Sequence, residues 1–193
     1  MKVALGWKTH SGWAVLIVIG EGPVLVDRQR ITLVEEGADW EKHPYHAAAH
    51  GEADVLVKRA VDAVQRTTLQ RMREVVEHCR ASGHELIACA VLMPGPMPAW
   101  STAEILAVHI RMHKAEGVLF PRVLCEAAEA CGLPVVAIAE KSLEEDACLR
   151  LGISTARMTQ QVGTLGRGAG APWGKDQRNA AVAALVALGK EIP

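Results

Sequence analysis

The sequence predicts an α/β fold in which a mixed sheet and helices form three layers. The chain opens with three short β-rich segments, at residues 3–7, 13–19 and 24–34, separated by turn signals. Two later apolar runs, 86–92 and 135–139, are continuous, as is typical of strands covered on both faces. Helical periodicity lies between and after these runs. The resulting order, β-β-β-α-β-α-β-α, describes an antiparallel hairpin sheet extended by strands that are connected through helices.

Each expected helix has its own signal. Residues 54–80 carry apolar side chains near the helical period, and Ser82-Gly83 ends this helix, whereas the polar stretch 35–52 is expected to be a loop with at most one helical turn. Ser101 and Glu104 form the pattern of a capping box, which opens another helix. That helix is expected at 101–116. Further helices are expected at 119–130, 143–151 and 155–162, followed by a Gly-rich loop at 163–174 and a buried final helix.

Length and composition indicate a single domain, residues 1–193. Half of the residues are hydrophobic, 22% are charged and the net charge is −1, which is typical of an ordinary globular protein. Proteins that contact many phosphates usually carry a basic excess or a clear basic patch. This chain has no such excess, so any nucleic-acid partner would need a local patch.

The cysteines and the N-terminus predict a cytoplasmic protein. The five cysteines form no CxxC pair and are odd in number, so they are interpreted as small core residues in a reduced compartment. The N-terminus lacks the layout of a signal peptide, and the apolar run 13–19 is too short to span a bilayer. No membrane partner is expected.

The final helix carries two polar residues near its N-terminal end. Asp176 and Asn179 are separated by three positions and therefore share one face of the first turns, ahead of the apolar run 180–188. A carboxylate at this position is also explained by the helix dipole and by capping. The two interpretations are a functional site and simple helix stabilisation.

The chain has three segments, at residues 4–15, 106–138 and 176–184, that together resemble the RuvC-type Holliday-junction resolvases of the ribonuclease-H-like superfamily. Ala4-Leu-Gly-Trp-Lys8, followed by Ser11-Gly-Trp-Ala-Val15, resembles their first hairpin. Residues 106–138, with Glu116-Gly117, resemble their central helices and following strand, and residues 176–184 resemble their closing Asp-x-x-Asp helix. The resemblance implies a ribonuclease-H-like fold, with a mixed five-stranded sheet flanked by helices, and a role linked to nucleic acid.

The acidic site of these nucleases is only partly matched. They cleave with two divalent ions held by clustered carboxylates. The resemblance places the first Asp at Lys8, or at Trp7 if the register slips by one, and it places a Glu at Met93 or Pro94. Asp176 is retained, and Asn179 replaces the last acid. The expected role is therefore nucleic-acid binding or a weakened, metal-dependent phosphodiester hydrolysis.

The candidate residues for that role come from the resemblance and from the predicted strand ends. Asp176, Glu116 and Glu140 are the candidate catalytic acids, with Lys8 and Asn179 as substrate contacts. Glu140 follows the strand 135–139, where open α/β sheets place ligands, although it equally begins an acidic helical connection.

The Gly-rich stretch offers one more substrate contact. Arg167, with backbone N–H groups of the stretch 163–174, is a candidate phosphate contact. The alternative is a flexible connection to the final helix.

Histidines suggest a second kind of site. His43, His46 and His50 lie close together in the loop, and the fold would bring His10 to the same end of the sheet, so His10, His43 and His46 are candidate metal ligands. The alternative is a polar surface loop. His109, His113 and Glu116 form a stripe on one helix, which is either a metal-binding pair with an acid or a solvated face.

Three functions remain open from the sequence. Besides the nucleic-acid role, the apolar residues and five tryptophans suit a non-catalytic interaction module with a protein partner or a homo-dimer. A third function is hydrolysis of a small phosphorylated substrate with a His-bound metal. The implied cofactor is a divalent metal. It would be Mg²⁺ or Mn²⁺ if the protein hydrolyses phosphodiesters, and Zn²⁺ if histidines bind the metal.

Overall fold

The computed structural model describes residues 1–48 and 52–189. One five-stranded sheet has the order β3-β2-β1-β4-β5. Strands β1 and β2 and strands β2 and β3 pair antiparallel, whereas β4 pairs parallel with both β1 and β5. The strands are β1 (Lys2–His10), β2 (Trp13–Gly20), β3 (Val24–Thr32), β4 (Glu85–Met93) and β5 (Val135–Ala139). The predicted mixed α/β sheet is confirmed, with β3 ending two residues earlier than expected.

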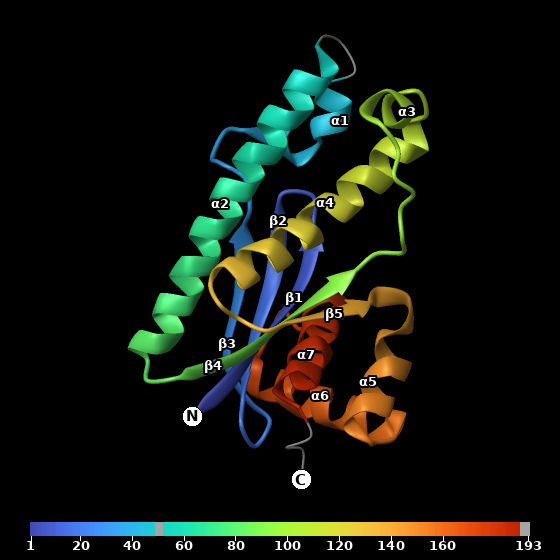
Figure 1. Ribbon diagram of the computed structural model, residues 1–193. Coiled ribbons are helices and arrows are strands. Elements are labelled where there is room, and N and C mark those ends of the chain that lie inside the picture. Colours follow the sequence, from blue (N-terminus) through green and yellow to red (C-terminus); the bar gives the residue numbers. More distant parts are fainter. Residues whose placement is uncertain (49–51, 190–193) are drawn as a thin grey trace.

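Helices cover both faces of the sheet, as Figure 1 shows. The helices of one layer are α1 (Pro44–Ala47), α2 (Ala53–Ala81), α3 (Thr102–Leu106) and α4 (His109–Ala130). Those of the other layer are α5 (Leu143–Leu151), α6 (Thr155–Ala169) and α7 (Lys175–Leu188). Short 3₁₀ turns, η1 (Asp39–Lys42) and η2 (Glu140–Ser142), complete the order. No helix in the described part of the chain is both long enough and apolar enough to cross a membrane.

The period of two along β1 divides the core between the two layers. Leu5 and Trp7 pack with α2 and α4, whereas Ala4 packs with the α5–α7 layer. Lys8 and His10 have the same parity as Ala4, so β1 directs them toward the α7 side of the sheet.

Helix α7 lies directly on β1 because both surfaces are built from small residues. An added Cβ atom at Gly6 would lie 2.0 Å from the carbonyl oxygen of Ala180 and 2.6 Å from the amide nitrogen of Ala184. Alanines 180, 181, 183 and 184 are all completely buried. The prediction of a buried final helix is therefore confirmed, and the close packing fixes the position of its N-terminal end.

Two helix boundaries differ from the prediction. The capping box of Ser101 and Glu104 is present, but α3 is short, and the chain breaks at Val108, which is extended. Helix α4 then runs without interruption through Gly117 and Pro121. Proline removes one backbone donor from a helix interior, and here the burial of the apolar face of α4 against the sheet and α2 offsets that loss.

The Gly-rich stretch is more helical than expected. Helix α6 continues to Ala169, so the prediction of a loop over 163–174 is wrong for its first half. Packing explains the extension, because Val162 and Leu165 are buried in the core beneath α7. The loop shortens to the segment that connects Ala169 to Lys175.

All five cysteines are free thiols, and two of them are completely or nearly buried. Burial raises the pKa of Cys89 well above its usual range and raises the pKa of Cys125 to about 11. Both thiols are therefore protonated near neutral pH, which suits the interpretation of these residues as small core side chains.

Candidate functional site

A cleft of about 270 Å³ lies at one end of the sheet. The parallel strands β1, β4 and β5 all point toward this end, where open α/β sheets place ligands. Residues from four separate parts of the chain meet there, and three of these parts contribute polar side chains. The residues that line it include Lys8, His10, Pro94, Glu116, Phe120 and Glu140.

Lys8 and Glu140 form an ion pair across the end of β4. The Nζ atom of Lys8 donates a hydrogen bond to Oε2 of Glu140 at 2.9 Å, although the two residues are 132 positions apart. The side chains are 15% and 31% exposed, so the pair lies in a partly dehydrated part of the cleft. The ammonium group thus occupies the first-strand position at which the resemblance places a carboxylate.

Asp176 lies beside His10 rather than beside the other acids. Its Oδ2 atom is 3.0 Å from Nε2 of His10, and both side chains are about one-third exposed. The His10 ring stacks on Trp13 with centroids 4.2 Å apart, and the Arg30 guanidinium lies 4.0 Å from the Trp13 ring centroid. The start of α7 is thereby tied to the tip of the first hairpin.

Glu116 is the most deeply buried acid of the site. It is 2% exposed, and its oxygens lie 3.0 Å from Nδ1 of His43 and 2.8 Å from Nδ1 of His46. The backbone N–H of His46 donates a further hydrogen bond to Oε1 at 3.2 Å. Burial raises the pKa of the adjacent Tyr45 hydroxyl, an effect that Arg122 opposes and Glu116 reinforces. Glu116 therefore anchors the 43–46 segment onto α4.

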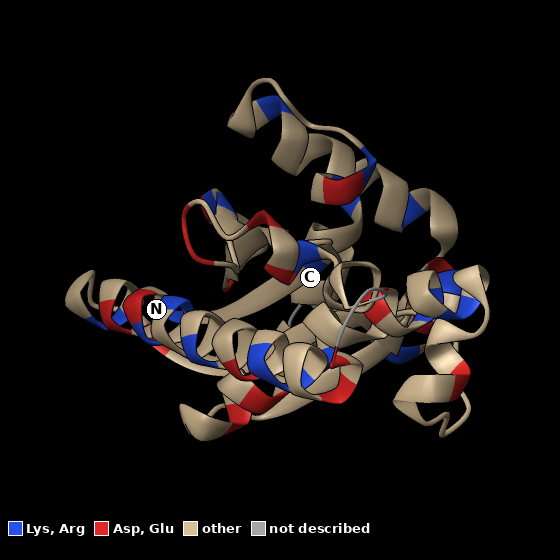
Figure 2. Cartoon of the chain, turned by 90° about the horizontal axis from the view of Figure 1, so that it is seen from above, with Lys and Arg blue, Asp and Glu red and all other residues tan. Residues whose placement is uncertain are grey.

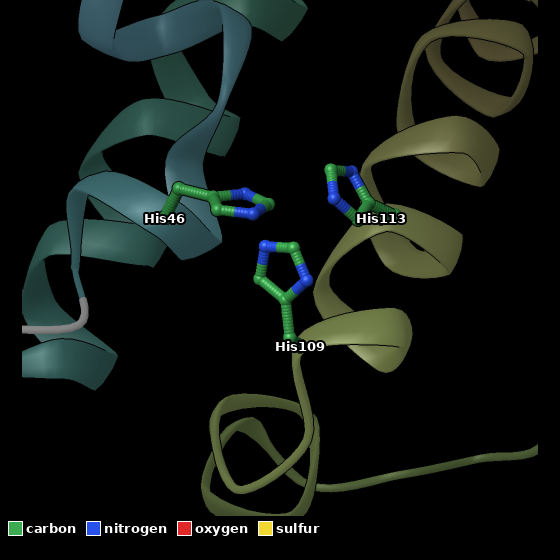
Figure 3. Close-up of side chains that lie close together, drawn as sticks. All are labelled: His46, His109 and His113. Carbon is green, nitrogen blue, oxygen red and sulfur yellow. The ribbon is translucent and has the colours of Figure 1, made fainter.

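Three imidazoles meet on the outer side of that anchor. The rings of His46, His109 and His113 point toward one another from α1 and α4 (Figure 3). One ligand atom from each lies within 4.8 Å of the others, and a second such group in the described residues consists of His43, His46 and Glu116. His109 and His113 are exposed, as a solvated face predicts, but Glu116 on the same stripe is not.

The structure separates several residues that the sequence analysis placed together. His10 belongs to neither histidine group, because the hairpin carries it to Asp176, and His50 lies outside the described residues. Arg167 lies on α6, where its guanidinium donates to Thr164 Oγ1 of the same helix at 2.9 Å. Asn179 lines a different cavity, of about 350 Å³, which it shares with Glu140 and Arg178.

The sequence contains one signal for the burial of Glu116. Glu116 stands between the buried residues Ala115 and Leu119 on α4, so its side chain begins on an inward face. A buried carboxylate requires partners, and the polar, histidine-bearing stretch 35–52 is a candidate source of them. His113 and His109 precede Glu116 on the same helix by about one and two turns.

Comparisons with known proteins agree with this architecture. No protein-family model and no curated protein matches the chain. Among solved structures, it is similar to T. thermophilus RuvC in complex with a Holliday junction substrate, with a TM-score of 0.55 and 13% identity, covering 96% of this chain and 92% of that one. A second Thermus thermophilus RuvC structure gives a TM-score of 0.51 and 14% identity, covering 95% and 92%. The chain therefore has the ribonuclease-H-like fold of RuvC.

Proposed function

We propose that this protein binds nucleic acid at the cleft of Lys8 and Glu140 and does not cleave it by two-metal chemistry. The observation that carries the proposal is the ammonium group of Lys8, which lines the cleft at the end of the first strand. A cation there repels a metal ion and attracts a phosphate. The fold supports nucleic acid as the class of ligand, because the RuvC structure that this chain resembles was solved in complex with a Holliday junction substrate.

The acids of the site do not fit a pair of Mg²⁺ or Mn²⁺ ions. Such ions take oxygen ligands from carboxylates that converge on them. Here Glu140 is paired with Lys8, Asp176 with His10, and Glu116 with two histidines. Each carboxylate is already paired with a nitrogen group of the protein, and the three carboxylates have three different partners, so they do not converge on a shared point. This arrangement supports binding over cleavage.

The charge distribution favours modest, local contacts with the ligand. Lys and Arg segments are interspersed with Asp and Glu segments along the helices in the view of Figure 2, in keeping with the net charge of −1. Few phosphates are therefore neutralised at once, and we expect a shallow dependence of affinity on salt concentration. Shape recognition at the cleft would then contribute more than long-range attraction.

The Lys8–Glu140 pair provides a test with two opposite expected results. Replacing Lys8 with methionine should weaken binding of a fluorescent four-way DNA junction roughly tenfold, which corresponds to about 1.4 kcal/mol. It should also reduce the salt slope by about one. Replacing Glu140 with glutamine should tighten binding, because it removes a negative charge and frees the ammonium group. Fluorescence anisotropy measures both effects.

Lys2→Met is the matched control. Lys2 lies at the opposite end of the same strand and is exposed, so its loss should leave junction affinity unchanged. Equal weakening in Lys2→Met and Lys8→Met would mean that binding is diffuse, and the cleft would lose its role. Weaker binding in Glu140→Gln would likewise contradict the proposal.

The interaction-module alternative would be favoured by one large exposed apolar patch. In the described part of the chain, the large exposed apolar side chains are spread over several elements: Met1, Val24, Val55, Val108, Ile110 and Leu149. A protein partner and a homo-dimer stay predictions, as does hydrolysis of a small phosphorylated substrate.

A further inference from the structure

We propose that His46, His109 and His113 form a binding site for one Zn²⁺ ion, with Glu116 orienting His46. The site is distinct from the Lys8–Glu140 pair and does not depend on a nucleic-acid function. It differs in chemistry from the two-metal carboxylate site that the resemblance implies, because its ligands are imidazole nitrogens. Such ligands favour Zn²⁺ and similar transition metals over Mg²⁺.

The local structure brings the three rings together. His109 begins α4, and His113 follows four residues later, so the two side chains share one helical face. His46 lies in α1, which packs against α4. The ring centroids are 4.5 Å apart for His109 and His113, 4.7 Å for His46 and His113, and 5.1 Å for His46 and His109.

Hydrogen bonding leaves the required nitrogens available. When the Glu116 carboxylate accepts a hydrogen bond from Nδ1 of His46, 2.8 Å away, that nitrogen carries the proton. The lone pair of a neutral His46 ring is then on Nε2. Within residues 1–48 and 52–189, the rings of His109 and His113 make no hydrogen bond or ion pair to other side chains. Three imidazoles therefore face one another, and each has at least one nitrogen with no hydrogen-bond partner among the described residues.

The second group, His43, His46 and Glu116, is explained without an ion. Its nitrogen and oxygen atoms are already joined by hydrogen bonds of 3.0 and 2.8 Å. A carboxylate that holds the other nitrogen of a metal-bound histidine is a recurrent arrangement, because it fixes the ring and raises its basicity. Glu116, 2% exposed and held on a core helix, is placed to do this for His46.

The dimensions fit a tetrahedral ion after small side-chain rotations. Zn–N bonds of about 2.0–2.1 Å place ligand nitrogens about 3.3 Å apart, and the three ligand atoms here lie within 4.8 Å of one another. His109 and His113 are exposed, so no tightly packed core surrounds their rings. Three histidines on one side leave the fourth position open to water, as in zinc sites that keep a reactive position.

The test is isothermal titration of the chelator-treated full chain with zinc chloride. The wild-type protein should bind one ion per chain. His109→Ala and His113→Ala should each weaken binding more than about 100-fold, since even orienting residues contribute about 10–100-fold. His78→Ala, which removes an exposed helical histidine from α2, is the matched control and should bind as the wild type does.

Glu116→Gln separates orientation from ligation. It should weaken zinc binding about 10–100-fold while the one-to-one stoichiometry is retained. Co²⁺ in place of Zn²⁺ should give intense visible absorption from a four-coordinate site, and His113→Ala should lose it. Circular dichroism checks that each variant is folded, and no DNA is present, so failure here leaves the nucleic-acid proposal untouched. Absence of zinc binding, or binding unchanged in both His109→Ala and His113→Ala, would overturn the zinc site.

Discussion

Replacing Gly6 with alanine is expected to lower the free energy of unfolding by about 3 kcal/mol. The added methyl carbon would lie 2.0 Å from the Ala180 carbonyl oxygen and 2.9 Å from the Ala184 Cβ atom. The nearest of these atoms is backbone, so no side-chain rotation relieves the clash. Helix α7 would have to move away from β1, and Asp176 at its start would move with it. The midpoint of urea-induced unfolding measures the loss.

Gly117→Ala is the control for that substitution. Gly117 lies within α4 and an added Cβ atom there meets nothing within 4 Å. Alanine costs less backbone entropy than glycine in a helix, so this variant should gain roughly 0.5–1 kcal/mol. If Gly6→Ala lost less than about 1 kcal/mol, the direct contact of α7 with β1 would be contradicted.

Replacing Glu116 with alanine is expected to lower the free energy of unfolding by about 2 kcal/mol. The variant removes the acceptor of three hydrogen bonds, two from imidazole nitrogens and one from the backbone N–H of His46. A buried donor without a partner costs about 1–3 kcal/mol. The exposed sides of the two rings can still be hydrated, which limits the loss.

Glu126→Ala, on the same helix, is its control. Glu126 is 45% exposed and contacts Arg122 at 3.6 Å, so its removal should change stability by less than about 0.5 kcal/mol. Thermal unfolding of the two variants side by side gives the comparison. Equal stability of Glu116→Ala and the wild type would mean that Glu116 does not anchor the 43–46 segment.

The strands were predictable because their signal is local. Alternation and apolar runs place all five strands in the sequence, and the turn residues separate them. Helix boundaries depended on packing instead. Pro121 favours a helix break near its own position, whereas the structure has the break at Val108. Helix α6 continues through Gly163, Gly166 and Gly168 because Val162 and Leu165 are buried. Local propensity is a weak prior where tertiary contacts decide.

The candidate site was predicted by residue but not by pairing. Lys8, His10, Glu116 and Glu140 line the cleft, and Asp176 contacts His10 beside it, while their roles stay predictions. Their partners follow from tertiary placement: Lys8 meets Glu140 across β4, and His10 meets Asp176 from a hairpin tip. No spacing rule connects residues 132 or 166 positions apart.

The histidine group shows the same limit. From the sequence, His46 was assigned to one candidate metal site and the pair His109 and His113 to another, because they belong to different elements. Only the path of the chain over α4, fixed by the buried carboxylate of Glu116, brings them together. Burial of an acid on an apolar helical face is the signal that would have linked them.

A cleavage assay under conditions of saturated binding tests directly whether the protein binds nucleic acid without cleaving it. A labelled four-way junction is mixed with excess protein, binding is confirmed by anisotropy, and Mn²⁺ is then added before the strands are separated on a denaturing gel. We expect bound but intact strands, in the wild type and in Asp176→Asn alike. Specific nicking by the wild type that disappears in Asp176→Asn would show a working two-metal site and contradict this expectation.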